Sequence, residues 1–244
     1  MIDFTDLKNI GRPIIIGHRG APKAARENTV EAFEKAMALG VDAVEFDVRR
    51  TADDVLVVHH NARVTPNTQR IALSPYEKVQ KAARGRGYEV PTLDEVLDVC
   101  RGRVSIDVEL KETGYEEEVI EAVLKKFDLR HVMFKSFRES CVKKLMSYEP
   151  SLFAGLLLGY KIDISKGSGL RKKISPLARV QRTGAQFVSP HWRLLRRGFI
   201  DRMHEAGLPV FTWTVNDPRV ALRLIRRGVD GIITNVPDEM ATLR

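Results

Sequence analysis

The sequence predicts a (β/α)8 barrel, an α/β fold in which eight parallel strands alternate with helices. Short β-branched and aromatic runs alternate with helix-length segments along 244 residues, and this number of units at this length matches such a barrel. A unit also recurs in which a helical pattern ends at a glycine and an apolar run follows, as at Gly40, Gly184, Gly207 and Gly228. The rival is a doubly wound sheet, but no G-x-G-x-x-G motif follows the first strand.

The elements follow in order along the chain. The expected strands span residues 14–17, 43–48, 104–109, 131–135, 153–158, 186–189, 209–214 and 230–234. The expected helices span residues 28–40, 92–101, 115–127, 137–147, 170–183, 193–206 and 218–227. Helix starts are marked by residue pairs that fit capping boxes or an N-cap followed by proline: Thr92 with Glu95, Ser136 with Glu139, Asn28 with Glu31, and Asp217 with Pro218. No linker divides the chain, so a single domain over residues 1–244 is expected.

One apolar run, residues 55–60, is surplus to the eight strands. A two-residue turn at Asp53–Asp54 would fold this run back as a hairpin on the second strand, with Asp47 opposite His60. The hairpin would carry a histidine to the mouth of the barrel. Residues 61–91 contain several Pro and Gly, and we expect them to form a small loop-rich insertion that covers this mouth.

The net charge of +8 is unevenly distributed. Residues 161–202 hold eleven Lys and Arg against two Asp, a net charge of +9, and the rest of the chain is almost neutral. A basic stretch is typical of proteins that bind nucleic acid, a membrane surface or a phosphate-bearing substrate. A solvated arginine-rich surface is the simpler interpretation of this charge.

Several protein classes are excluded by composition and by missing motifs. Cys100 and Cys141 are too few for a disulfide framework or a four-cysteine zinc site. The longest apolar run, residues 152–160, is too short to span a membrane, and the N-terminus has no signal-peptide pattern, so we expect a cytoplasmic protein. No H-E-x-x-H or G-x-S-x-G motif supports a zinc protease or a serine hydrolase. No helix-turn-helix, RNA-recognition or zinc-finger motif supports nucleic-acid binding.

Polar residues gather where the first two strands end, which is where barrel enzymes hold their active sites. The first strand ends in His18 and Arg19 between two glycines. Histidine exchanges protons near neutral pH, and the planar arginine fork suits phosphate oxygens. Glu45 and Asp47 lie on one face of the second strand, because residues two apart in a strand face the same side.

The next expected barrel strand places Asp107, Glu109 and Lys111 on one face by the same period. Carboxylates that converge from two neighbouring strands are costly to bury unless a cation neutralises them. Paired oxygen ligands suit a hard divalent ion such as Mg²⁺ or Ca²⁺. Spacing alone does not choose between Asp107 and Glu109 as the third ligand, and Lys111 would then meet a phosphate.

Eight motifs occur in a characteristic order. They are GHRG (17–20), ENTVEAFEKA (27–36), AVEFDVRRTADDVLVVHH (43–60), PTLDEVLD (91–98), DVELK (107–111), KSF (135–137), WTVN (213–216) and DGIITNVP (230–237). In this order and spacing the sequence resembles the glycerophosphodiester phosphodiesterase family over almost its whole length. The resemblance implies a (β/α)8 barrel and metal-dependent hydrolysis of glycerophosphodiesters to glycerol 3-phosphate and an alcohol.

The resemblance also implies roles for nine residues. The matching positions are His18 and His60 for the catalytic histidines, Glu45, Asp47 and Glu109 for the ligands of Mg²⁺ or Ca²⁺, Arg19 and Lys111 for phosphate contacts, Glu27 for an outer acidic group, and Trp213 for an aromatic side chain at the mouth. The two histidines would act as general acid and general base, and the sequence does not say which is which.

The sequence departs from the family pattern at three positions. Arg26 stands where the family usually has proline, and Asn61 stands where an aspartate beside His60 is usual. His59 stands where an apolar residue is common in the family, and for that reason we treat it as non-catalytic.

The expected partner is a small glycerophosphodiester and not nucleic acid. The basic stretch adds the expectation of a weak association with a membrane surface, and the oligomeric state is left open. The alternative function is a lysophospholipase of the D or C type, which would use the same residues on a lysophospholipid.

Overall fold

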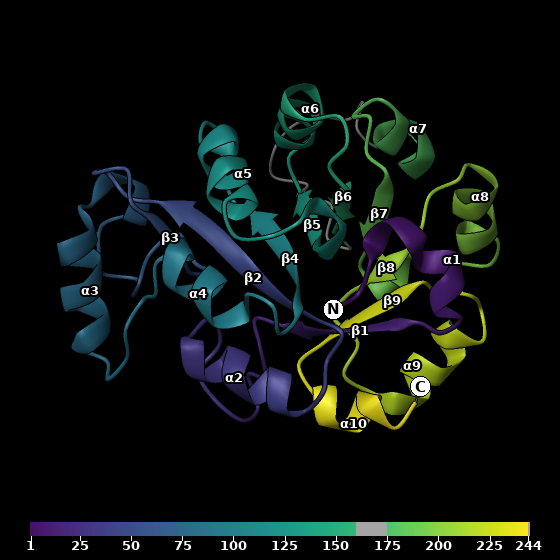
Figure 1. The fold of residues 1–244 in the computed structure, drawn as a ribbon, viewed down its shortest axis with the longest axis horizontal. Coiled ribbons are helices and arrows are strands. Elements are labelled where there is room, and N and C mark those ends of the chain that lie inside the picture. The colour runs from purple at the N-terminus through teal and green to yellow at the C-terminus, as the bar shows by residue number, and fades with distance from the viewer. Residues whose placement is uncertain (160–174, 244) are drawn as a thin grey trace.

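The computed structural model describes residues 1–159 and 175–243, in which strands and helices alternate around a barrel (Figure 1). The strands are β1 (Ile14–His18), β2 (Ala43–Arg50), β3 (Leu56–Val58), β4 (Ser105–Leu110), β5 (Val132–Ser136), β6 (Ala154–Leu158), β7 (Phe187–Pro190), β8 (Phe211–Thr212) and β9 (Gly231–Thr234). The helices are α1 (Leu7–Ile10), α2 (Val30–Ala38), α3 (Tyr76–Arg84), α4 (Leu93–Cys100), α5 (Glu116–Leu124), α6 (Glu139–Tyr148), α7 (Pro176–Gln181), α8 (Phe199–Glu205), α9 (Pro218–Ile225) and α10 (Pro237–Ala241).

Eight strands form a parallel sheet in the order β7-β6-β5-β4-β2-β1-β9-β8. Parallel bridges between Val188 and Val210 and between His191 and Trp213 bring β8 back against β7, so the barrel is nearly closed. The strands are buried almost throughout because helices cover the sheet, which explains their continuous apolar runs. The prediction of a (β/α)8 barrel is confirmed.

Aromatic side chains fill the barrel where its strands begin. Phe153 directly precedes β6, while Phe187 and Phe211 are the first residues of β7 and β8, and their three rings pack against one another. Phe4, near the N-terminus, stacks on Phe153 with ring centroids 6.1 Å apart. Gly155 is required here, because an added Cβ would lie 2.2 Å from the Phe187 ring. This end of the barrel is therefore packed solid.

The hairpin of β2 and β3 forms as predicted, but its register was wrong by one residue. Val48 pairs with Val58, because the loop contains the three residues 52–54 and not two. Asp54 in this loop has a left-handed backbone with φ 62°, as three-residue hairpin loops require.

The register changes which histidine lies opposite Asp47. The backbone N–H of His59 donates to the carbonyl oxygen of Asp47 at 2.8 Å, so His59 and not His60 is the ladder partner. His60 follows the end of β3, where the chain leaves the ladder.

The insertion differs from its prediction in two ways. It contains α3, which packs Val79 and Ala83 against Val57 of β3 in a small core of its own. It lies at the outer side of the barrel next to β3 and α4 (Figure 1), and no residue of 61–91 lines the central cavity described below. The expectation that it covers the mouth was wrong.

Two predicted helix starts are confirmed. Thr92 and Glu95 form a capping box in which each side chain accepts the other residue's backbone N–H. Asp217 caps α9 by accepting the N–H of Arg219 at 2.8 Å, with Pro218 as the first helical residue.

Two other predicted caps were wrong, because tertiary contacts use the side chains. Ser136 donates to the carbonyl of Leu110 at 2.8 Å, and α6 begins after Arg138 instead. Thr29, not Asn28, caps α2.

The region after β6 bears on the basic stretch. Residues 161–174 lie outside the described ranges, so only α7 and the residues around it test the predicted helix 170–183. Arg179 and Arg182 both pair with Glu139 of α6, so part of the positive charge is neutralised locally. No helix in the described ranges is long and apolar enough to cross a membrane. The cytoplasmic location stays a prediction.

Candidate active site

The carboxyl ends of the barrel strands open on a cavity of about 180 Å³. Its charged and histidine side chains come from several strands and the loops after them: His18, Arg19, Glu45, His60, Glu109, Lys111 and Lys135. The structure thus brings six of the nine predicted site residues to the cavity wall through these side chains. Trp213 also lines it, while Asp47 and Glu27 lie behind Arg19.

Three carboxylates converge at the floor of the cavity. Glu45 and Asp47 come from β2, and Glu109 lies opposite Asp47 in the β2–β4 ladder. One oxygen of each carboxylate lies within 4.8 Å of one oxygen of the other two, and all three side chains are buried. The donor set is all oxygen and carries three negative charges, which suits a hard divalent cation.

The electrostatics of this cluster supports the same conclusion. Burial raises the pKa of Glu109, and the carboxylates of Asp47 and Glu45 raise it further although Lys111 opposes them. Burial also acts to raise the pKa of Asp47, but Lys111, Arg19 and His60 together hold it below its usual range. The repulsion at Glu109 is what a bound divalent cation relieves, so the residues present fit such an ion.

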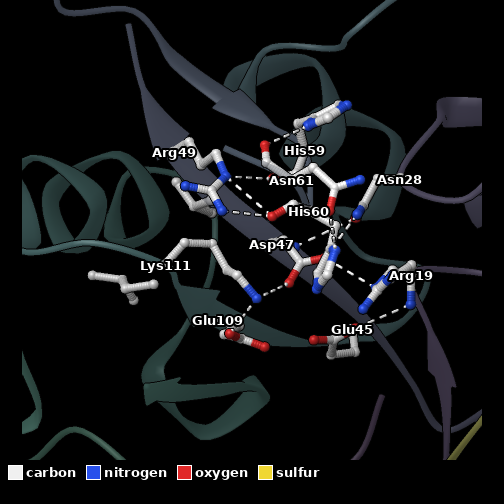
Figure 2. A network of polar contacts seen from close by, with 12 residues as sticks. Arg19, Asn28, Glu45, Asp47, Arg49, His59, His60, Asn61, Glu109 and Lys111 are labelled. Carbon is white, nitrogen blue, oxygen red and sulfur yellow. Dashed lines mark hydrogen bonds and ion pairs between the residues drawn. The ribbon is translucent and has the colours of Figure 1, made fainter. Parts of the chain in front are cut away.

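Two cations lie beside the Asp47 carboxylate. The Nζ atom of Lys111 is 3.0 Å from Asp47 and 2.6 Å from Glu109 (Figure 2). The Nε atom of Arg19 is 3.2 Å from Asp47, and its Nη1 atom donates to Glu27 at 2.9 Å. Both cations line the cavity, where they can face an anionic group.

His18 is held with one ring nitrogen toward the cavity side. Its Nδ1 atom lies 2.6 Å from Oδ1 of Asn235, and this oxygen can only accept, so Nδ1 carries the proton. The Nε2 atom then offers its lone pair, 3.9 Å from Glu45. Burial lowers the pKa of His18, against the raising effect of the Glu45 carboxylate. Asn235 follows β9 and was not singled out from the sequence.

His60 takes a similar arrangement. Its Nδ1 atom lies 3.1 Å from Oδ1 of Asn61, which leaves Nε2 as the free acceptor. Its ring points toward Asp47, whereas the ring of His59 points away (Figure 2). Burial lowers the pKa of His60 to about 4, with Asp47 opposing and Lys111 adding to the shift.

Three residues that sequence reasoning missed support these groups. Arg49 donates to the backbone carbonyls of His59 and His60, at 3.1 Å and 2.6 Å, and fixes the turn that carries them. Arg49 follows Glu45 and Asp47 at a spacing of two residues along β2, and this spacing could have identified it from the sequence.

Lys135 explains why Asp107 is not in the carboxylate cluster. The Nζ atom of Lys135 is 2.6 Å from Asp107 and 3.5 Å from Glu45, and both Lys135 and Asp107 are buried. Lys135 belongs to the KSF motif at the end of β5, and this position at a strand end could have identified it as a site residue. The third missed residue is Asn28, whose side-chain amide donates to Asp47 at 2.8 Å.

An aromatic wall faces the charged side of the cavity. Trp213 packs edge-on against Phe137 with ring centroids 5.4 Å apart, and its Nε1 donates to the carbonyl of Ser189 at 2.9 Å. Leu157 and Ile233 complete this side. The cavity thus joins an apolar wall to a charged floor, as expected of a site for a small amphipathic anion.

Comparisons with known proteins agree with this geometry. The YhdW protein of Bacillus subtilis is 31% identical to this chain, covering 92% of it and 95% of YhdW. A glycerophosphodiester phosphodiesterase of Caldanaerobacter subterraneus is 29% identical, covering 95% of this chain and 98% of its own. A glycerophosphodiester phosphodiesterase from Thermotoga maritima, known from its crystal structure, is 26% identical to this chain. The two structures align with a TM-score of 0.77 over 95% of this chain and 98% of the other.

Two further proteins are similar at lower identity. An Oleispira antarctica phosphodiesterase, solved in complex with the product sn-glycerol-3-phosphate, shares the fold at 22% identity. Its TM-score is 0.78, over 96% of this chain and 97% of the other. A lysophospholipase D of Rattus norvegicus is 25% identical, covering 92% of this chain and 84% of its own. The model of the glycerophosphoryl diester phosphodiesterase family matches residues 18–239, nearly the whole chain, and this chain therefore belongs to that family of enzymes.

Proposed function

We propose that this enzyme hydrolyses glycerophosphodiesters to glycerol 3-phosphate and an alcohol by metal-dependent, two-histidine acid–base catalysis. The observation that carries the proposal is the convergence of three carboxylates and two histidines on one small cavity. The product seen in the Oleispira antarctica relative is the product expected here.

The carboxylates of Glu45, Asp47 and Glu109 would hold the divalent cation, Mg²⁺ or Ca²⁺. When bound, such a cation supplies positive charge that neutralises phosphoryl oxygens and activates the phosphorus toward attack. Arg19 and Lys111 add fixed positive charge on the same wall and would stabilise the charge that develops on the phosphoryl group.

The two histidines would handle the protons. The bond from phosphorus to the alcohol oxygen breaks as the attacking oxygen bonds to phosphorus. One histidine would take a proton from the attacking water at its Nε2 atom, and the other, after taking up a proton at its own Nε2 atom, would give it to the leaving alkoxide. His18 and His60 both present Nε2 as the free nitrogen, since their Nδ1 atoms bond to Asn235 and Asn61.

The second candidate is a lysophospholipase D, and the observation that favours it is the aromatic wall of Phe137 and Trp213. Phe137 is 40% exposed, so an apolar side chain already stands at the opening. A lysophospholipid would need this surface for its acyl chain, whereas a glycerophosphodiester without an acyl chain would not.

The test measures release of glycerol 3-phosphate from glycerophosphocholine, and release of choline from lysophosphatidylcholine, with Mg²⁺ or Ca²⁺ present. We expect His18→Ala, His60→Ala and excess EDTA each to lower turnover of glycerophosphocholine by about 10²-fold or more. His59→Ala is the matched control, since its ring points away from the cavity, and it should retain far more activity than His60→Ala. Full activity in His60→Ala or in EDTA would refute the mechanism, and faster turnover of the lysophospholipid would favour the second candidate.

A further inference from the structure

We propose that Tyr88, a residue of the insertion, is a positioning residue that fixes two active-site loops against each other. One loop (19–28) carries Arg19 and Glu27, and the other (59–61) carries His60. Tyr88 contacts Arg26 in the first loop and His59 in the second. The inference rests on the proposed function, because it concerns how the phosphate-binding and proton-transferring groups are held.

The contact with the first loop is a cation–π interaction. The guanidinium carbon of Arg26 lies 3.5 Å from the centroid of the Tyr88 ring. The next residue, Glu27, accepts from the guanidinium of Arg19 at 2.9 Å. The backbone N–H of Asn28 also donates to the carbonyl of Arg19 at 3.1 Å, so the two ends of this loop are tied together. Fixing the position of Arg26 therefore also fixes the neighbouring Glu27, whose carboxylate orients Arg19, the residue predicted to bind the phosphate.

The contact with the second loop is a hydrogen bond. The Oη atom of Tyr88 lies 3.4 Å from Nε2 of His59. The Nδ1 atom of His59 lies 2.8 Å from the carbonyl oxygen of Asn61 and must donate to it, so Nε2 accepts from the tyrosine hydroxyl. Asn61 in turn holds Nδ1 of His60 by its side chain. A chain of polar contacts thus runs from Tyr88 to His60 (Figure 2 shows its last three members).

Tyr88 is itself anchored by α3. Its backbone N–H donates to the carbonyl of Ala83 in the last turn of that helix at 3.3 Å. The neighbouring Val90 donates its N–H to the side chain of Gln80 at 3.0 Å, and Val90 is buried in the core of the insertion. Because Tyr88 is anchored on a helix and a small core, it can restrict the loops that it contacts. Loops without such an anchor hold their functional groups less precisely.

The two contacts serve different steps, and this makes the proposal testable. The Arg26 contact supports Glu27 and Arg19, which would bind the phosphate, so its loss should raise KM. The His59 contact supports His60, which would move a proton only during the reaction, so its loss should lower kcat. A purely structural role would lower thermal stability without separating these two parameters.

The experiment compares Tyr88→Phe, Arg26→Met and Tyr88→Leu in the metal-loaded enzyme with glycerophosphocholine. Tyr88→Phe keeps the ring and loses the hydroxyl, and we expect kcat to fall by about threefold or more with KM unchanged. Arg26→Met should raise KM by about threefold with kcat unchanged. Tyr88→Leu should show both effects, and adding Arg26→Met to it should raise KM no further.

A matched control and a second readout separate the possible failures. Tyr148→Phe removes the hydroxyl of a tyrosine of α6, outside the insertion, which donates to the carboxylate of Glu121 at 3.0 Å, and should leave kcat and KM unchanged. Histidine ring NMR signals, assigned with His60→Gln, should move for His60 in Tyr88→Phe and not in Tyr148→Phe. Unchanged kinetics and spectra in Tyr88→Phe and Tyr88→Leu would overturn the proposal. A wild-type enzyme that hydrolyses no glycerophosphodiester would instead refute the proposed function, and the spectra would still test the positioning role.

Discussion

At the scale of single residues, the environment of His60 sets how the site responds to pH. Its Nδ1 atom meets a neutral amide oxygen on Asn61, and burial lowers its pKa to about 4. A histidine with a lowered pKa stays unprotonated, and thus able to accept a proton, well below the usual range near 6.5. The sequence departure at Asn61 therefore removes a charge and keeps an orienting contact.

We expect Asn61→Asp to raise the pKa of His60. The new carboxylate would lie within hydrogen-bond distance of Nδ1 and would favour the protonated ring, typically by about one unit or more. If His60 is the base, the acidic limb of the profile of kcat/KM against pH should move upward by about one unit. Asn61→Ala is the control, since it loses the orienting contact without adding charge and should lower kcat without an upward move. A limb that stays in place in Asn61→Asp would contradict this account.

Residue by residue, the sequence predicted the groups whose position follows from strand alternation. Glu45 and Asp47 lie two residues apart on β2, and Glu109 lies opposite Asp47 on β4, so strand alternation places all three side chains on one face of the sheet. Lys135 and Asn235 were not assigned roles, because their partners Asp107 and His18 lie on other strands. Such cross-strand pairings depend on the barrel register, which no local pattern contains.

At the scale of elements, local signals held where they had no tertiary competitor. The capping box at Thr92 is on the exterior of the barrel and forms as predicted. The equivalent serine, Ser136, is fully buried and bonds to the strand next to it instead. The hairpin register failed for a related reason, since Asp54 tolerates the left-handed conformation and so permits a longer loop than the shortest one.

Removal of the cap at Thr92 should have a local and measurable cost. We expect Thr92→Ala to lower the free energy of unfolding by about 1 kcal/mol, a fall of about 2–4 °C in Tm. Thr92→Ser keeps the hydroxyl and should unfold close to the wild-type temperature. Calorimetry on both variants checks this, and equal losses for alanine and serine would show that the hydroxyl is not what stabilises α4.

At the scale of the whole molecule, the barrel was predictable because eight repeated units leave few alternatives for burying so many apolar strands. The basic stretch was less informative. Two of its arginines are paired with Glu139, and none of its described residues supplies a charged group to the cavity floor. Steering of anionic substrates and contact with a membrane surface both stay predictions.

Metal binding should stabilise the whole fold, because the carboxylates come from two strands of the barrel. A ligand at one hundred times its Kd stabilises a protein by about 2.7 kcal/mol. We therefore expect saturating Mg²⁺ or Ca²⁺ to raise Tm of the metal-stripped protein by several degrees. Glu109→Gln should lose most of this rise, while Glu27→Gln, whose carboxylate lies outside the cluster, should keep it. An equal rise in Glu109→Gln would argue against the assigned ligands.

The aromatic layer at the start of the strands has a consequence for how substrate enters and products leave the active site. Phe4, Phe153, Phe187 and Phe211 fill one end of the barrel, so in the described part of the chain the cavity opens at the other end, where the strands finish. Substrate arrives and both products depart by the same opening. The products must therefore leave the cavity before the next substrate molecule can bind, and a slowly released product acts as a competitive inhibitor.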